Sequence, residues 1–229
     1  MVIGETDRGM GEGSMNVIFD MDGVILDTER LFLECCIPAA EQLDLPGIEE
    51  VVCECTGMTD EETRKRLRER YGKDAPLEEF GSLVYSYFKQ RCEKSGIPVK
   101  EGVVELLDFL RERGARIAIG SSTHSEIIEP ELRDAGIYDY FNAIVGGEMV
   151  EASKPAPDVF LLAAEKLQAS IRDCIIIEDS FNGVRAAHAA GATVFMVPDL
   201  LQPTEEIRAL TDRVFSSLLE VKDYINTCD

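Results

Sequence analysis

The sequence contains the run Asn16-Val17-Ile18-Phe19-Asp20-Met21-Asp22-Gly23-Val24-Ile25-Leu26-Asp27-Thr28. Its apolar start predicts a short buried strand, and two aspartates follow directly where that strand ends. A carboxylate near a protein core is costly unless something compensates its charge. Asp20 and Asp22 therefore indicate a bound cation, a reacting group, or both. Open parallel sheets bind ligands at the carboxyl ends of their strands, so we expect the functional site there.

Downstream of this stretch, from Lys100 onward, helical and strand patterns alternate. Short apolar runs predict strands at 116–120, 143–145, 174–177 and 193–197, and amphipathic segments between them predict helices. Strands separated by helices of about ten residues imply right-handed crossovers and a parallel sheet. The first strand must join that sheet, which gives an α/β, Rossmann-like, doubly wound core.

The segment between the first strand and the rest of the sheet shows only helical signals. Leu31, Phe32, Cys35 and Ala39 recur at helical spacing, with Pro38 expected to kink that helix. Thr59-Asp60-Glu61-Glu62 has the form of a capping box that opens a helix through Arg70, and a further helix is expected from Pro76 towards Ser95. We therefore expect a helical-bundle cap at 29–98 inserted into a core made of 15–28 and 99–229, after a flexible Gly-rich tail at 1–14.

Composition limits the classes of partner. The formal net charge of -21 opposes binding to nucleic acid or to anionic membranes, both of which need basic surfaces. The longest apolar runs are far shorter than the ~20 residues that span a bilayer. The 7 cysteines are odd in number, show no CxxC spacing and follow no export signal, which favours free thiols in a cytoplasmic protein. The sequence predicts no oligomeric state.

Polar side chains follow four of the predicted strands. Doubly wound topology brings these strand ends to one rim of the sheet, where acids, one cation and hydroxyl groups would form a single site. That combination fits a divalent hard cation held by carboxylates together with a phosphate group. Each motif alone has a plain structural explanation, as a turn, a solvated loop or a helix cap, but their joint occurrence favours a functional site. The residues are Asp20 and Asp22, Ser121 and Ser122, Lys154, and Glu178 with Asp179.

The order and the residues of these motifs resemble those of the haloacid dehalogenase superfamily of phosphotransferases. The resemblance runs from Met15 to Val197 and is carried by 20–28, Ser121, Lys154, Glu178-Asp179 and Asn182-Gly183. The helical insert directly after the first motif looks like the small helical cap of the subfamily that contains phosphoglycolate phosphatases and β-phosphoglucomutase.

The resemblance implies a role for each residue. Asp20 would be the nucleophile that forms an aspartyl-phosphate, and Asp22 would protonate the leaving oxygen and then activate water. Lys154 would offset charge between Asp20 and the phosphoryl group, while Ser121 and backbone N–H groups near Ser122 would hold phosphate oxygens. Mg²⁺ would be bound by Asp20, the Asp22 backbone carbonyl and Asp179, with Glu178 ligating directly or through water.

The favoured function is a Mg²⁺-dependent phosphatase of a small phosphorylated metabolite. The alternatives are a β-phosphoglucomutase-like phosphotransferase and a non-catalytic phosphate-binding or receiver-like module, which would have neither the insert nor a second carboxylate at the position of Asp22. A true dehalogenase would need neither Mg²⁺ nor Asp22. Mutase relatives carry a histidine where this chain has Phe32, and an arginine near Gly57-Met58-Thr59-Asp60, the cap loop expected to set specificity.

Other polar residues are expected to be structural. His124 and His188 lie on predicted helices without a paired acid. The basic run from Arg64 to Arg70 is expected to be a solvated helix face balanced by Glu61 and Glu62, and Asp27 and Thr28 to shape the hinge into the cap.

Overall fold

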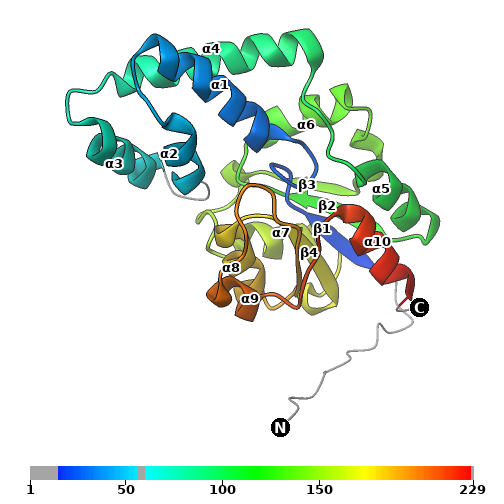
Figure 1. Cartoon of the computed structure of the whole chain (residues 1–229). Coiled ribbons are helices and arrows are strands. Elements are labelled where there is room, and N and C mark those ends of the chain that lie inside the picture. Colours follow the sequence, from blue (N-terminus) through cyan, green and yellow to red (C-terminus); the bar gives the residue numbers. More distant parts are fainter. Residues whose placement is uncertain (1–14, 56–59, 228–229) are drawn as a thin grey trace.

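A computed structural model of the protein describes residues 15–55 and 60–227 (Figure 1). Its centre is a six-stranded sheet in the order β3-β2-β1-β4-β5-β6, with every neighbouring pair parallel. This is the predicted doubly wound α/β arrangement. The strands are β1 (Asn16–Phe19), β2 (Arg116–Gly120), β3 (Ala143–Val145), β4 (Cys174–Glu178), β5 (Thr193–Met196) and β6 (Arg213–Val214).

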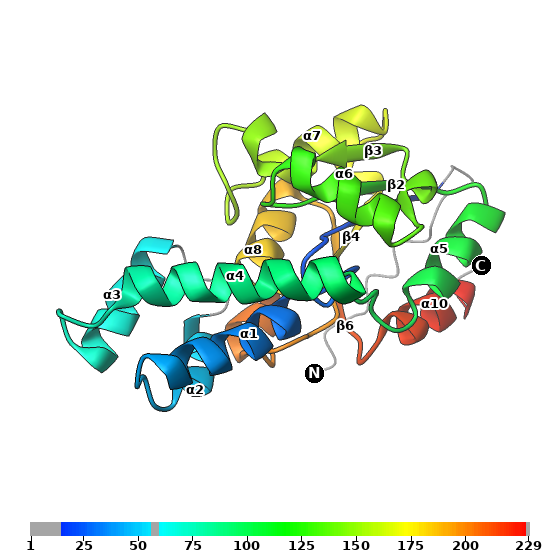
Figure 2. The ribbon, with the colours of Figure 1, turned by 90° about the horizontal axis from the view of Figure 1, so that it is seen from above.

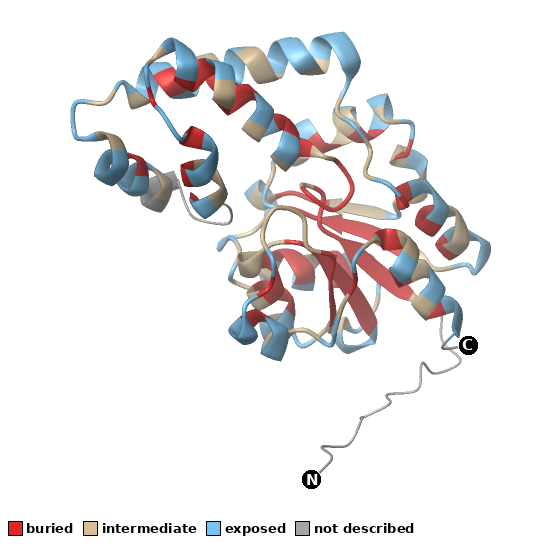
Figure 3. Cartoon of the chain, in the orientation of Figure 1, coloured by how far each residue is buried: buried red, intermediate tan, exposed pale blue. Residues whose placement is uncertain are grey.

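The first strand occupies the middle of the sheet, and all of its residues are buried. Val17 pairs with Ile117 of β2 on one side and with Ile175 of β4 on the other. Successive side chains of a strand point to opposite faces. Accordingly Phe19 packs in one hydrophobic cluster and Ile18 in another, and Figure 3 shows the sheet as the buried centre of the core.

Helices cover both faces of the sheet. On the Phe19 face lie α5 (Val103–Glu112), α6 (Ser125–Asp134) and α10 (Leu218–Thr227). On the Ile18 face lie α7 (Asp158–Lys166), α8 (Phe181–Ala190) and α9 (Glu205–Leu210). Single 3₁₀ turns occur at η1 (Tyr138–Tyr140), η2 (Gly147–Met149) and η3 (Ile171–Asp173).

The inserted segment forms a helical unit at one end of the core (Figures 1 and 2). It consists of α1 (Thr28–Gln42), α2 (Ile48–Cys55), α3 (Asp60–Tyr71) and α4 (Leu77–Ser95). These helices share a hydrophobic cluster separate from the two that flank the sheet, and we call this unit the cap. Helix α1 continues past Pro38. The predicted capping residue Thr59 lies outside the described residues.

The two chain segments that join cap and core lie side by side. Leu26 forms an antiparallel bridge with Val99, and the backbone N–H of Asp27 donates to the Pro98 carbonyl at 2.8 Å. The side chain of Lys100 adds ionic contacts, at 2.6 Å to Asp199 Oδ1 and 3.6 Å to Asp27 Oδ1. This hinge therefore includes Asp27, as predicted, and two charged residues that the sequence analysis did not identify.

Among the α-helices and strands, four were not predicted from the sequence: α2, β6, α9 and α10. Strand β6 has two residues, too few for an alternating pattern. Helix α10 is recognisable in hindsight, because Leu218, Val221 and Ile225 are its buried face. None of the described helices is long and apolar enough to cross a membrane. The six described cysteines are free thiols.

Candidate active site

The site begins at the carboxyl end of β1. Asp20 is the first residue after the strand, and its backbone N–H donates to the Ile177 carbonyl of β4 at 2.9 Å, which continues the sheet pairing. The residue is buried, with 7% of its surface exposed. The central strand thus delivers a carboxylate to the rim of the sheet while leaving it almost no contact with water.

Lys154 is the cation that meets this carboxylate. Its Nζ lies 2.5 Å from Asp20 Oδ1 and 2.7 Å from Glu178 Oε1, and its side chain is 6% exposed. Burial alone would lower the pKa of Lys154, but the carboxylates of Asp20 and Glu178 outweigh it and hold the pKa above its ordinary value. Lys154 therefore remains an ammonium group shared by two acids.

Glu178 is the last residue of β4 and is completely buried. Its Oε2 accepts hydrogen bonds from the backbone N–H groups of Asp179 and Ser180, each at 2.9 Å, and from the Ser180 hydroxyl at 3.0 Å. Ser180 also caps α8 by accepting from Gly183 N. The N-terminus of α8 and Lys154 together compensate the charge of Glu178.

Asp20, Glu178 and Asp179 form the predicted acidic cluster. One carboxylate oxygen from each residue lies within 4.8 Å of the others, and all three residues are buried. Asp179 Oδ1 is buried without a hydrogen-bond partner. Hard divalent cations take such oxygen donors, so the three residues fit a Mg²⁺ site, and the orphaned oxygen of Asp179 is the observation that favours one.

The excess negative charge of the cluster also favours a bound cation. The cluster has three carboxylates, and Lys154 contacts two of them, those of Asp20 and Glu178. Burial raises the pKa of Asp20 to about 8, repulsion from Glu178 and Asp22 adds to the effect, and Lys154 opposes it. Burial and repulsion from Glu178 and Asp20 likewise raise the pKa of Asp179 well above its ordinary value. A bound cation would relieve this excess of negative charge.

The side chain of Asp22 is separate from this cluster. Its Oδ1 accepts from the Thr28 hydroxyl at 2.8 Å, and its Oδ2 accepts from the Thr123 hydroxyl at 2.7 Å and, more distantly, from Ser121 at 3.4 Å. Any contribution of Asp22 to metal binding would come from its backbone carbonyl, which stays a prediction. The carboxylate itself lies between the hinge and the residues that follow β2.

Ser121, the predicted phosphate ligand after β2, is fully buried, and its hydroxyl accepts from Thr123 N at 3.0 Å. Ser122 is exposed beside it. Thr123 was missed by the sequence analysis. The signal that could have found it is the run of three hydroxyl residues, Ser121-Ser122-Thr123, at a strand end.

Of the residues expected to be structural, Thr28 contacts Asp22, whereas the two histidines and the basic run take no part in this constellation. His124 is the N-cap residue of α6, and His188 Nδ1 contacts the Leu210 carbonyl at 3.2 Å. In the basic run, Arg66 pairs with Glu54, and the other four members are exposed on α3. Side chains of Glu61 and Glu62, predicted to balance the run, lie outside the described residues.

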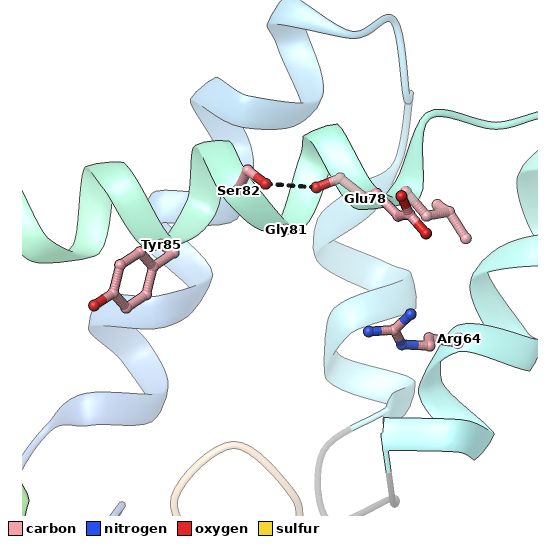
Figure 4. Close-up of a pocket in the computed structure, with 6 residues that line it drawn as sticks. Arg64, Glu78, Gly81, Ser82 and Tyr85 are labelled. Carbon is pink, nitrogen blue, oxygen red and sulfur yellow. Dashed lines mark hydrogen bonds between the residues drawn. The ribbon is translucent and has the colours of Figure 1, made fainter.

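The cap contains a pocket of about 410 Å³ between α3 and α4. Figure 4 shows Arg64 of α3 on one side of this space and Tyr85 of α4 on the other. The Ser82 hydroxyl donates to the Glu78 carbonyl at 2.8 Å along the wall formed by α4. The predicted specificity loop runs from Thr56 to Asp60, and residues 56–59 of it lie outside the described residues.

Comparisons with known proteins place the chain among one family of hydrolases. A family model described as haloacid dehalogenase-like hydrolase matches residues 17–197. A phosphorylated carbohydrates phosphatase of Thermotoga maritima is 30% identical over 210 residues, which is 92% of this chain and 96% of that protein. The crystal structure of a HAD family hydrolase from Deinococcus radiodurans, with bound phosphate and sodium, superposes with a TM-score of 0.80 at 26% identity, covering 94% of this chain and 96% of that one.

A β-phosphoglucomutase from Clostridium difficile is also similar in structure. It gives a TM-score of 0.70 at 22% identity over 94% of this chain and 97% of that one. At this identity the likeness shows a common fold.

Proposed function

This chain belongs to the haloacid dehalogenase-like hydrolase family, and we propose that it is a Mg²⁺-dependent phosphatase that releases phosphate from a small phosphorylated metabolite through an aspartyl-phosphate. The observation that carries the proposal is the contact of Lys154 with both Asp20 and Glu178, next to the orphaned oxygen of Asp179. These groups form a buried nucleophile, its neutralising cation and a set of metal ligands at one rim.

In the first step Asp20 attacks phosphorus, and the bond from phosphorus to the ester oxygen of the substrate breaks. Asp22 gives its proton to that leaving oxygen. Lys154, fixed beside Asp20, offsets the negative charge that would otherwise keep the phosphoryl group away from the nucleophile. Ser121 and backbone N–H groups near Ser122 hold the phosphoryl oxygens.

In the second step Asp22, now a carboxylate, takes a proton from water, and that water attacks the phosphorus of the aspartyl-phosphate. Inorganic phosphate leaves and Asp20 is regenerated. Asp20, Asp179 and Glu178 would hold Mg²⁺, and a bound Mg²⁺ would offset the negative charge of the phosphoryl group and favour the ionised form of Asp20. The protein chiefly positions the reacting groups and neutralises their charge, as expected for a loose, metaphosphate-like transition state.

The proposed substrate class rests on the name of a relative and on the net charge of the chain. The similar Thermotoga protein is named for action on phosphorylated carbohydrates. A chain of net charge -21 repels phosphate esters at long range, so binding must depend on the local cations at the site. We propose a sugar phosphate or a phospho-organic acid as substrate, acted on in the cytoplasm, where the six described free thiols would remain reduced.

The test is phosphate release from a panel of sugar phosphates and phospho-organic acids, with Mg²⁺ and with EDTA. We expect Mg²⁺-dependent turnover that Asp20→Asn abolishes without changing the circular dichroism spectrum, because this substitution removes the nucleophile and keeps the shape. Asp223→Asn, at an exposed position on α10, is the matched control and should retain full activity. Turnover within tenfold of wild type in Asp20→Asn would overturn the mechanism.

A further inference from the structure

The carboxylate of Asp22 is held by hydroxyl groups from two different parts of the protein. Thr28, the first residue of cap helix α1, donates to Oδ1, and Thr123, from the core, donates to Oδ2. The Thr123 contact, at 2.7 Å, is shorter than the 3.4 Å contact from Ser121 to the same oxygen. Thr123 is therefore the principal core donor to Asp22 among the described residues.

The backbone of Thr123 is fixed on both sides. Its N–H donates to Ser121 Oγ at 3.0 Å, and its carbonyl accepts from Gly147 N at 3.1 Å. The turn after β3 packs tightly on this segment, because a Cβ atom at Gly147 would lie 2.3 Å from the Ser122 carbonyl oxygen and one at Gly146 would lie 2.9 Å from that of Thr123. The Thr123 hydroxyl thus projects from a backbone with little freedom to shift.

This contact matters for the reaction because of where the proton on Asp22 must go. A general acid acts only when it is aimed at the leaving oxygen, and a side chain that can rotate away loses effective concentration. A hydroxyl that donates to Oδ2 restricts that rotation.

We propose that Thr123 is a positioning residue that orients Asp22 for proton transfer. The proposal rests on the proposed phosphatase function and adds a residue to it. Thr123 acts through Asp22. Its loss should therefore impair the transfer of a proton to the leaving oxygen, and substrate binding should change little.

The experiment compares Thr123→Val, which keeps the shape and removes the hydroxyl, with Thr123→Ser, which keeps the hydroxyl. Each is assayed with the best alkyl phosphate of the panel and with p-nitrophenyl phosphate, whose leaving group needs little protonation. For the alkyl phosphate we expect Thr123→Val to lower kcat roughly 10- to 100-fold with KM within about threefold, the range for a lost hydrogen bond to a charged group. For p-nitrophenyl phosphate kcat/KM should fall less than about threefold, since proton donation contributes little there.

Thr123→Ser should restore most of the activity towards the alkyl phosphate. Thr211→Val, which removes a surface hydroxyl that donates to the Arg208 carbonyl, is the control and should behave as wild type in both assays. If Thr123 had a merely structural role, Thr123→Val would lower the activity towards both substrates equally and would lower the melting temperature as well. That result would overturn the proposal. Unchanged kinetics in Thr123→Val would also overturn it. If the wild-type enzyme itself released no phosphate from any ester, the phosphatase function would fail instead.

Discussion

A Cβ atom at Gly183 would lie 1.6 Å from Oε1 of Glu178. The first turn of α8 can approach this buried carboxylate so closely only because residue 183 has no side chain. The same Oε1 accepts from Lys154, which in turn contacts Asp20. Gly183 therefore makes room for the chain of contacts that ends at the proposed nucleophile.

Replacing Gly183 should lower kcat by more than the accompanying loss in the free energy of unfolding would explain. In Gly183→Ala the methyl group must displace Glu178, and with it Lys154, so we expect kcat to fall on the order of 100-fold, as for a misplacement of about 1 Å. Gly81→Ala is the matched control, because a Cβ at that helical position would meet nothing within 4 Å. It should keep wild-type activity. A kcat for Gly183→Ala within threefold of wild type would show that Glu178 adapts without moving Lys154.

Removing the buried cation should destabilise the protein as well as inactivate it. Lys154→Met leaves Asp20 and Glu178 buried without their ammonium partner, and breaking a buried ion pair in this way costs about 3–5 kcal/mol. We expect the loss in the free energy of unfolding, from urea titrations, to be larger at pH 8 than at pH 5, where the acids can bind protons. Lys166→Met, exposed at the end of α7, should change it little. Equal losses for both variants would contradict this.

Much of the core was predictable from the sequence because its signals are local. The apolar run before Asp20, the later strands and the acids at their ends all follow from residue spacing, and the structure has the predicted parallel sheet. The helical insert was equally predictable, since α1 and α4 have apolar residues at helical spacing. Only α2, a helix of 8 residues with cysteines among its apolar positions, was not separated from its neighbours.

The contacts within the site were less predictable because they depend on residues distant in sequence. Glu178 was predicted to bind the metal directly or through water, but the sequence did not show that its two oxygens also contact Lys154 and the backbone N–H groups of residues 179 and 180. Thr123 was missed because nothing in Ser121-Ser122-Thr123 shows which hydroxyl reaches Asp22. That choice depends on how the turn at Gly146 and Gly147 packs against the segment.

Metal binding should reverse an unusual pH dependence of stability. Burial raises the pKa of Asp20 from an ordinary 3.8 to about 8, so between these values the metal-free folded protein binds protons that the unfolded chain releases. This contribution to stability is fully present below about pH 4 and is lost as the pH rises through about 8. Mg²⁺ favours the ionised acids, so it should stabilise the protein more at pH 8 than at pH 5.

Melting temperatures measured from pH 5 to pH 8, in EDTA and in Mg²⁺, test this directly. In EDTA the stability should fall towards pH 8 less steeply for Asp20→Asn than for wild type, because the asparagine does not titrate. A shift caused by Mg²⁺ that is equal at all pH values, or larger at pH 5, would count against a metal site at Asp20, Glu178 and Asp179.

The enzyme should hydrolyse phosphate esters and should not isomerise β-glucose 1-phosphate. The mutases that this chain resembles carry a histidine at the position of Phe32, where α1 presents a side chain that is 45% exposed and has no proton to exchange. They also carry an arginine in the cap loop, where this sequence has Asp60, a group that repels the second phosphate of a bisphosphate intermediate. Without both groups we expect the aspartyl-phosphate to be open to water.

Incubation with β-glucose 1-phosphate and Mg²⁺, followed by phosphorus NMR, should show inorganic phosphate as the product. Glucose 6-phosphate formed faster than phosphate is released from any substrate of the panel would make the chain a mutase.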